Sequence, residues 1–309
     1  MIDNAAIFMQ TGSSIAAERI SSVNDNTMQS HFHPYYELFY LEKGTREVVI
    51  GDHSFSLQPH DFIIFPPYTM HHSFSGHNIE FSRVVLYFKP EVLPPEIDAM
   101  LQQNLQPHTL VSPEQKLDFY HQLCQLISEQ EHPDSLFHEQ VLFSRLELLL
   151  MSGLRYQRTA IEPHTKARIA KIVKYIHNHY DEDLGLEALA TRFFVNKYHL
   201  CREFKRFTMC NFVEYVNKIR VLHAQRLFVE SDKTITQIAM DVGFGSLTHF
   251  ERVFFQHTGQ KPKKMCTLMR EQRDHNGIKS LRVPPLPLSE APVTADVRAL
   301  NRDSATLVV

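Results

Sequence analysis

The stretch ITQIAMDVGFGSLTHFERVFFQHTG, residues 235–259, decides how the second half of this chain folds. The glycines of VGFG suit a tight turn, because glycine adopts positive φ angles without steric cost. Ser246, directly after the turn, is a typical helix N-cap. Phe250 and Phe254 then recur four residues apart, which is the spacing of one buried helix face. The stretch therefore predicts two short helices joined by a tight turn, the helix-turn-helix arrangement.

An earlier stretch of the chain repeats this pattern. The segment LEALATRFFVNKYHLCREFKRFTM begins at Leu186 and aligns with residues 235–259 at an offset of 49 residues before the turn and 50 residues after it. Asn196 takes the N-cap position of Ser246, and the spaced apolar residues of the two segments also match. Because a repeated pattern indicates a repeated structural unit, we predict two helix-turn-helix units.

Charge is divided unevenly along the chain. Residues 1–163 hold 9 Lys and Arg against 20 Asp and Glu, a net charge of −11, whereas residues 164–274 hold 19 against 12, a net charge of +7. A basic module joined to an acidic one favours contact with a polyanion, although a solvated basic surface has the same composition. No apolar run is long enough to span a bilayer. Four scattered cysteines without a CxxC pair suit a reducing cytoplasm.

The basic half resembles the AraC/XylS family of transcription regulators. The likeness rests on LEALA and LCREFK in the first unit, on FVEYVNKIRVLHAQRLF between the units, and on the order IA, VGF, F, R, F, TG, P in the second unit. It implies two helix-turn-helix units joined by a long helix, about Val216 to Glu230, that reach two successive major-groove segments of double-stranded DNA. By this resemblance, the DNA-contacting residues are Lys197, Tyr198, Cys201, Arg202, Lys205, Leu247, Thr248, His249, Glu251 and Arg252.

Three positions depart from the family pattern. Met209 stands where the family has glycine, Glu203 replaces an apolar residue, and Phe255 replaces a basic one. The second reading helix is therefore less basic than the family pattern implies. We expect replacement of Arg202 to weaken binding to a cognate DNA site more than replacement of Arg252 does.

The first 90 residues or so are expected to form a β-barrel or sandwich. Short apolar runs rich in aromatic and β-branched residues, such as REVVI and FSRVVLYF, alternate with turn-forming clusters. From Pro113 to Tyr156 the apolar period becomes helical, and the two predicted helices carry more apolar surface than one barrel face needs. That surplus favours a homodimer contact over packing within one chain.

Histidines and a glutamate alternate in HFHPYYELFYLEKG, residues 31–44. If residues 31–41 form one strand, alternate side chains share a face; these are His31, His33, Tyr35, Glu37, Phe39 and Leu41. The later run FIIFPPYTMHH supplies His71. This order resembles the cupin barrel, and the resemblance implies a centre for a divalent transition metal. Its ligands would be His31, His33, Glu37 and His71.

The same stretch also supplies the expected effector site, formed by His31, His33, Tyr35, Glu37, Phe39 and His71. Its aromatic walls, to which Phe32, Tyr36, Phe65, Tyr68 and Phe74 are further candidates, suit a sugar or another small organic molecule. They equally suit an ordinary barrel core. A hydrogen-bonded polar cluster without metal is the alternative to a metal centre.

The whole sequence predicts two domains, an N-terminal all-β cupin-like barrel with added helices and a C-terminal all-α double helix-turn-helix. We place the sensor barrel at residues 1–110, a helical dimerisation segment at 111–157, a linker at 158–165, the DNA-binding domain at 166–272 and a disordered tail at 273–309.

The function that this organisation predicts is that of a cytoplasmic, ligand-responsive transcription regulator, not an enzyme, and the family resemblance implies that it is an activator. Its expected partners are double-stranded DNA, a small-molecule effector such as a sugar, a second copy of the chain and RNA polymerase, with no membrane. The alternative is a metal-dependent cupin enzyme, an oxygenase or isomerase, with an accessory helical domain. Salt-dependent binding to DNA distinguishes the two.

Overall fold

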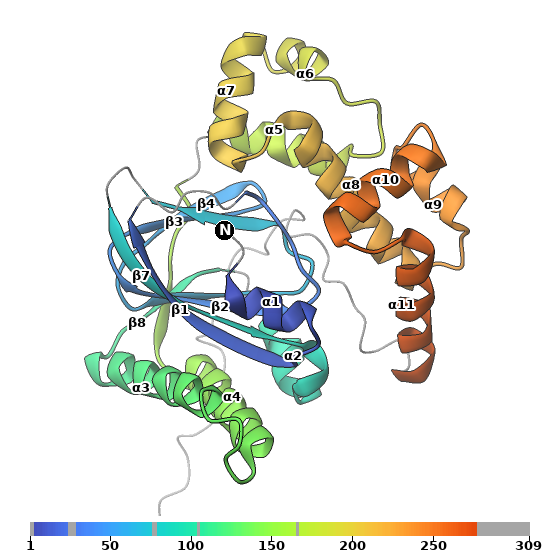
Figure 1. The fold of residues 1–309 in the computed structure, drawn as a ribbon. Helices are drawn as coiled ribbons and strands as arrows, with labels where there is room; N and C mark the ends of the chain where they lie inside the picture. Colours follow the sequence, from blue (N-terminus) through green and yellow to red (C-terminus); the bar gives the residue numbers. More distant parts are fainter. Residues whose placement is uncertain (1–2, 24–28, 76–78, 104–105, 165–166, 277–309) are drawn as a thin grey trace, which may run out of the picture.

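The chain folds into a β-rich N-terminal domain and a helical C-terminal domain (Figure 1). The computed structural model describes residues 3–23, 29–75, 79–103, 106–164 and 167–276. The predicted fold class, an all-β barrel with added helices followed by an all-α module, is confirmed. Within the described residues, no helix combines the length and the hydropathy needed to cross a bilayer.

Two sheets build the β-rich domain. The larger sheet has the strand order β1-β7-β2-β5-β8-β9 and the smaller one β4-β3-β6. The strands of the larger sheet are β1 Ile15–Val23, β2 Tyr36–Lys43, β5 Asp61–Phe65, β7 Glu80–Phe88, β8 His108–Leu110 and β9 Arg158–Ala160. Those of the smaller sheet are β3 Arg46–Ile50, β4 His53–Leu57 and β6 His71–Phe74. All the strand pairs are antiparallel.

Strand β2 separates two hydrophobic cores. Its side chains alternate between the faces of the sheet, as the pleat requires. Tyr36, Leu38 and Tyr40 pack in the core beneath the helices, whereas Phe39 and Leu41 pack inside the barrel. Because β2 is buried on both faces, it reads as a continuous apolar run interrupted by Glu37.

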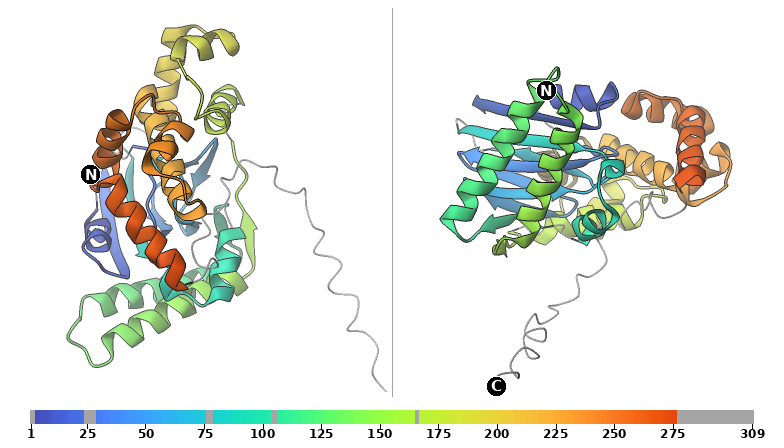
Figure 2. Two further views of the ribbon diagram at one scale, coloured as in Figure 1. Left: turned by 90° about the vertical axis from the view of Figure 1, so that its right-hand side faces the viewer. Right: turned by 90° about the horizontal axis from the view of Figure 1, so that it is seen from below.

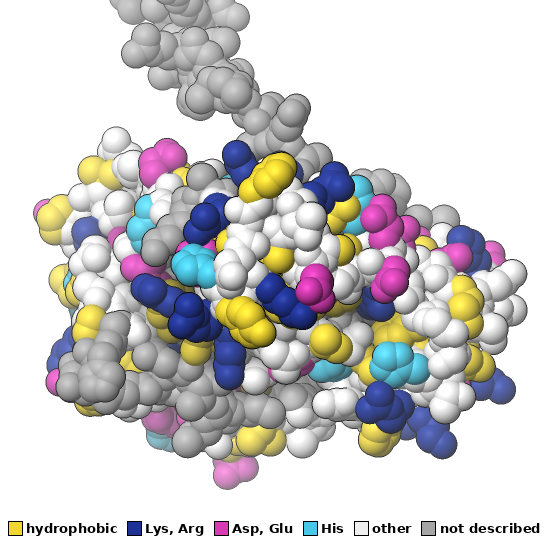
Figure 3. All heavy atoms as spheres, turned by 90° about the horizontal axis from the view of Figure 1, so that it is seen from above, with side chains coloured by type: hydrophobic (Ala, Val, Ile, Leu, Met, Phe, Trp, Pro, Cys, Tyr) yellow, Lys and Arg dark blue, Asp and Glu magenta, His cyan; other side chains and the backbone are white. Residues whose placement is uncertain are grey.

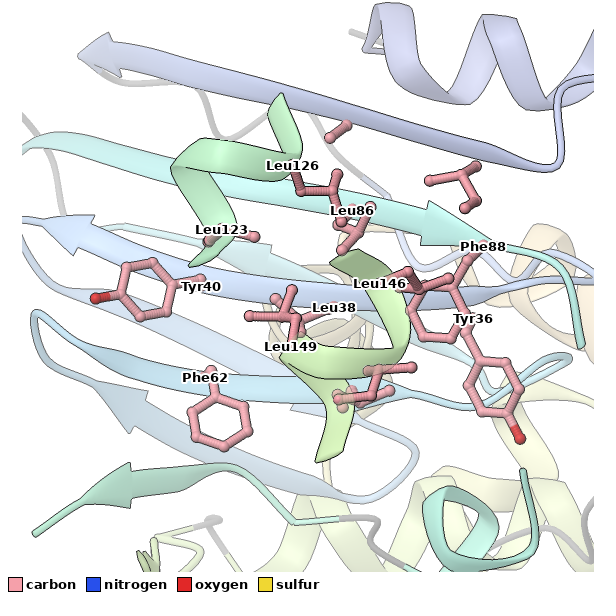
Figure 4. Packing of buried hydrophobic residues seen from close by; sticks show 14 of the residues in the cluster. Tyr36, Leu38, Tyr40, Phe62, Leu86, Phe88, Leu123, Leu126, Leu146 and Leu149 are labelled. Atoms are coloured by element: carbon pink, nitrogen blue, oxygen red, sulfur yellow. The ribbon is translucent and has the colours of Figure 1, made fainter. Parts of the chain in front are cut away.

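Helices cover the outer face of the larger sheet. Helices α3 (Pro113–Gln130) and α4 (His138–Arg155) lie across it as an antiparallel pair (Figure 2), with α2 (Pro95–Gln103) and a short 3₁₀ helix, Pro90–Val92, beside them. Figure 4 shows Leu123, Leu126, Leu146 and Leu149 of this pair among the aromatic side chains of the sheet. Each fully buried leucine contributes about 1.5–3 kcal/mol, so this core fixes the helices on the barrel.

An N-terminal helix, α1 (Asn4–Gln10), was not anticipated by the strand pattern. Ala5 and Met9 pack into the inner core of the barrel. Asp3 caps the helix at the amide of Ala6 (2.7 Å) and accepts a hydrogen bond from the hydroxyl of Tyr87 (2.9 Å). The helix is too short for an apolar period to be visible in the sequence, and its position depends on these contacts with β7.

The helical domain contains the two predicted units. The first has α5 (Ala167–Asn178), α6 (Leu186–Arg192) and α7 (Lys197–Thr208); the second has α9 (Ile235–Asp241), α10 (Leu247–Thr258) and α11 (Pro262–Asn276). Helix α8, Phe212–Glu230, joins them and begins one turn before the expected Val216. Leu200 and Phe204 are buried in the first unit, and Phe250 and Phe254 in the second, as their spacing predicts.

The structure differs from the expected domain boundaries at two places. The segment assigned as a linker, 158–165, begins with strand β9, which pairs with β8 and so belongs to the β-rich domain. Helix α11 runs to Asn276, four residues beyond the expected end of the DNA-binding domain. The part of the expected tail from residue 277 onward lies outside the described residues.

Candidate functional sites

The helices α7 and α10 are capped alike and present their predicted DNA-contacting faces outward. The Asn196 side chain accepts hydrogen bonds from the amides of Tyr198 (2.9 Å) and His199 (3.3 Å), and Ser246 accepts one from the amide of His249 (3.3 Å). Nine of the ten predicted contact residues are exposed, and Leu247 is half-buried. The exposed nine are Lys197, Tyr198, Cys201, Arg202, Lys205, Thr248, His249, Glu251 and Arg252.

The two reading helices differ in charge. Helix α7 carries four Lys or Arg residues and one glutamate, whereas α10 carries one of each sign. The glutamate of α7, Glu203, is engaged with Arg168 of α5 (3.2 Å) and with His199 (3.3 Å), which accounts for a polar residue at a position where the family has an apolar one. Figure 3 shows the end of the molecule that carries the helical domain, with Lys and Arg groups among hydrophobic side chains.

The turn of the first unit holds a residue that the sequence comparison of the two units missed. Phe194 aligns with Gly243 at the offset of 49 residues, and both have positive φ, 51° and 88°. The Phe194 side chain is 96% exposed. A bulky residue in this conformation is strained and is held there by its surroundings. Met209 repeats the case at the end of α7, with a φ of 56° where Gly259 has 68°.

Four polar side chains meet inside the barrel at the end nearest the helical domain. His31, His33, Glu37 and His71 each direct one ligand atom into a space where these atoms all lie within 4.8 Å of one another. The Glu37 Oε2 lies 3.1 Å from His33 Nε2 and 3.0 Å from His71 Nε2. Glu37 is only 2% exposed, and His31 is half-buried. The structure thus brings together the four residues of the expected metal centre.

Residues 31–41 do not form the single strand on which this centre was predicted. Strand β2 begins at Tyr36, and His31 instead makes an isolated β-bridge with His71. Pro34 lacks a backbone N–H and cannot continue the ladder, so the chain bends before β2. The histidines converge with Glu37 through this bend and the bridge rather than through strand alternation.

Backbone carbonyls fix the tautomer of all three histidines. His31 Nδ1 lies 3.0 Å from the Gln29 carbonyl, His33 Nδ1 2.8 Å from that of Tyr35, and His71 Nδ1 2.8 Å from that of Thr69. A carbonyl only accepts, so each Nδ1 carries the proton and donates it. In the neutral imidazole the Nε2 atom then carries the lone pair that can ligate a cation, and such outer hydrogen bonds are typical of metal-ligating histidine.

Burial and mutual contact shift the pKa values of three of these four groups. Burial, together with repulsion by His71 and His33, lowers the pKa of His31 well below its ordinary value, and burial also lowers the pKa of His33. Burial alone would raise the pKa of Glu37, but the imidazoles of His33 and His71 beside it hold that pKa well below its ordinary value. That effect requires protons on the two Nε2 atoms; without them, lone pairs would face the carboxylate, an arrangement that a bound cation would stabilise.

Aromatic rings pack around this centre on the barrel side. His33 stacks on Tyr35 with ring centroids 4.3 Å apart, and His71 stacks on Phe65 at 4.0 Å. Phe39 and Tyr35 are buried in the inner core of the barrel, on the face of β2 that carries Glu37. Tyr36, in contrast, points to the outer core, and is thus excluded from the aromatic wall proposed from the sequence.

Models of known protein families match both halves of the chain. The model of the AraC-like ligand binding domain matches residues 17–146, and that of a helix-turn-helix domain matches residues 189–267. The chain belongs to the AraC/XylS family of transcription regulators. This regulator combines a ligand-binding domain with a DNA-binding domain, and no match supports the alternative of a cupin enzyme.

Several proteins are similar to this AraC/XylS regulator. The HTH-type transcriptional activator RhaS of Escherichia fergusonii is 23% identical over 256 residues, which cover 79% of this chain and 88% of that protein. The bifunctional transcriptional activator/DNA repair enzyme AdaA of Bacillus subtilis is 32% identical over 108 residues, covering 35% and 51%. Among solved structures, the DNA-binding domain of AdpA in complex with a target DNA is 27% identical over 35% of this chain and 96% of its own, with a TM-score of 0.34. A structure of ToxT from Vibrio cholerae is 14% identical over 83% and 99%, with a TM-score of 0.35.

Proposed function

We propose that this regulator reads DNA with the exposed faces of α7 and α10, and that α7 contributes most of the electrostatic attraction. The observation that supports this is the pair of capped helices whose outward residues lie at equivalent positions of the two units. Arg202 suits a bidentate contact with a guanine edge, and Lys205 suits a phosphate. Lys197 is paired with Glu187 at 3.0 Å, so it would have to exchange this exposed ion pair for a DNA contact.

The test is the dependence of DNA affinity on salt. A cognate site is first selected from random DNA with the full chain, and the slope of log affinity against log salt concentration is then measured. Lys205→Ala should reduce that slope by about 1, because one phosphate contact is lost. Lys43→Ala, an exposed lysine of the sensor domain, is the matched control and should leave the slope unchanged. An affinity that does not vary with salt would contradict the assignment.

The remaining partners are inferred from the relatives and from exposed apolar side chains. The named relatives are activators, so we expect activation of transcription through contact with RNA polymerase. A second copy of the chain would cover apolar side chains left exposed on α3 and α4, namely Leu117, Leu148 and Met151. The compartment expected for a DNA-binding regulator is the cytoplasm.

We further propose that the centre formed by His31, His33, Glu37 and His71 binds a divalent transition metal. Three Nε2 lone pairs and one carboxylate are the ligand types that Zn²⁺ takes at about 2.0–2.2 Å, and the donors already lie close enough for a small contraction to place them there. A bound metal would supply the positive charge that this group of acceptors lacks. We expect its role to be structural or sensory rather than catalytic, because the family to which the chain belongs consists of transcription regulators.

Calorimetric titration of the chelator-treated chain with Zn²⁺ tests the metal proposal. One site per chain is expected, and it should be lost in Glu37→Gln, a substitution that keeps the size of the side chain. His164→Ala is the control, because His164 pairs with Glu47 at the surface away from the centre (2.9 Å). A sugar or other small organic effector in the same barrel end is the alternative. Binding of such a molecule without metal dependence would favour it.

A further inference from the structure

The residues that flank the metal-centre histidines contact the DNA-binding domain. His31 and His71 form a two-way bridge, with amide-to-carbonyl distances of 3.0 and 2.9 Å. Ser30 and Phe32 flank His31, and Met70 and His72 flank His71. The histidines direct their rings into the barrel, while these flanking residues face the helical domain. The same short segment therefore forms both the wall of the centre and the contact between domains.

Ser30 is the polar part of this contact. Its amide and its hydroxyl both donate to the carbonyl of Thr208 at the end of α7, at 3.2 and 2.7 Å. The hydroxyl lies 2.9 Å from Nδ1 of His72 and accepts its proton, since its own proton goes to Thr208. Ser30 is thus held from one side by α7 and from the other by the residue next to a proposed metal ligand.

A buried lysine of α8 completes the polar contact. Lys218 is 8% exposed, and its ammonium donates to the Ser30 carbonyl (2.9 Å) and to the side-chain oxygen of Gln29 (3.1 Å). It also lies 3.3 Å from the Cys210 thiol and 3.1 Å from Glu214. Separation of the domains would remove two of these four partners, and water would have to replace them.

Apolar packing surrounds this polar contact. Met70 is buried in the core of the first helix-turn-helix unit, although it belongs to the sensor domain. Phe32 packs against the cores of both units, and Tyr68 packs against that of the second. Both units of the DNA-binding domain are therefore seated on the segments that carry His31 and His71.

We propose that a divalent metal in this centre locks the DNA-binding domain onto the sensor barrel through Ser30 and the residues around it. This inference rests on the proposed metal centre and adds its regulatory consequence. The segment that carries His31 and His33 is not part of a continuous strand, so ordering it costs conformational entropy. Metal coordination by both histidines would order this segment before the domains dock, so that docking itself would lose less conformational entropy. By linkage, docking would in turn raise the affinity for the metal.

Cys210 provides a probe of the contact within the chain itself. It is 1% exposed and lies at the edge of the first unit's core, where its thiol is 3.8 Å from the Ser30 carbonyl of the sensor segment. Because that segment covers the thiol on one side, we expect a soluble maleimide to react faster when the domains part. Cys201 is exposed on α7 and should react quickly in either state. Cys266 is buried in the core of the second unit and reports unfolding of the domain rather than undocking.

The experiment compares the full chain after chelator treatment with the same chain reloaded with one equivalent of Zn²⁺ and desalted. Alkylation of each cysteine is followed by peptide mass spectrometry. We expect Cys210 to react at least about fivefold more slowly in the loaded chain, with Cys201 and Cys266 unchanged, a typical magnitude for coupling between two sites. In Glu37→Gln the added Zn²⁺ should have no effect, which excludes direct protection of the thiol by metal. Ser30→Ala should bind Zn²⁺ and yet react faster at Cys210.

Two failures of this experiment have different meanings. Absence of bound Zn²⁺ would overturn the metal centre and the lock together. Stoichiometric binding with an unchanged Cys210 rate would overturn the lock alone and leave the metal centre in place. If chelation also exposes Cys266, the helical domain has unfolded in the metal-free chain. The lock is then tested by comparing the Cys210 rates of Ser30→Ala and the unsubstituted chain, both loaded with Zn²⁺. Equal Cys210 rates in that pair would overturn the lock.

Discussion

Replacing Phe194 with glycine should stabilise the first helix-turn-helix unit, although it removes the largest side chain of the turn. Phe194 has a φ of 51°, in the left-handed region, where a residue with a Cβ carries a cost of about 1–2 kcal/mol. Glycine removes that cost but loses more backbone entropy on folding, by roughly 0.5–1 kcal/mol. Because the ring is 96% exposed, its removal forfeits little buried area. The net expectation is a gain of about 0.5–1 kcal/mol.

Native-state hydrogen exchange of the α6 and α7 amides measures this gain locally, without requiring the two-domain chain to unfold in one step. A gain of this size slows exchange up to about fivefold. Phe194→Ala is the matched control, because it removes the ring but keeps the Cβ that causes the strain. If Phe194→Gly exchanges no more slowly than Phe194→Ala, the strain argument is refuted.

The second unit offers the reciprocal substitution. Gly243 stands at the equivalent turn position with a φ of 88°, and a Cβ there would lie 2.7 Å from the Asp181 carbonyl oxygen. Gly243→Ala should therefore destabilise α9 and α10 by more than the roughly 1–2 kcal/mol of conformational strain alone. Hydrogen exchange of the α9 and α10 amides measures this destabilisation, and exchange of the α7 amides shows whether it is confined to the second unit.

Two further predictions concern the partners. Arg202→Ala should cost about 1–3 kcal/mol of affinity for a cognate DNA site, as expected for one lost bidentate base contact. The loss should exceed that of Arg252→Ala, because α10 is the less basic reading helix. Equal losses at matched salt would contradict this ranking. Leu148→Asp, which charges a residue 53% exposed on α4, should shift the chain toward monomer in sedimentation equilibrium. Val23→Asp, equally exposed on β1, should not, and a shift in both variants would point to general destabilisation instead.

Local signals explain why the helical domain was predicted in such detail. The caps at Asn196 and Ser246 and the paired phenylalanines act within one or two helical turns, so their spacing alone determines the two units. Contacts between distant segments have no such signature. Ser30 and Thr208, for example, are separated by 178 residues, and no periodicity in either segment indicates that they meet.

The candidate metal centre was predictable from the sequence only in part. Its residue types were evident in the sequence, but a single strand from His31 to Leu41 was the wrong reason for their convergence. The bend at Pro34 and the bridge between His31 and His71 depend on tertiary pairing with β6. The tautomers that make the site fit a cation also depend on three backbone carbonyls whose positions only the folded chain defines.

The central claim, that the sensor barrel of this AraC/XylS regulator holds a metal, is tested most directly by elemental mass spectrometry. The full chain is purified without a histidine tag or chelator, incubated with Zn, Mn, Fe and Ni in turn, and freed of excess metal. The account predicts close to one metal per chain, and close to none in Glu37→Gln treated identically. Full chains that retain none of the four metals would contradict it and would leave His31, His33, Glu37 and His71 as a polar cluster.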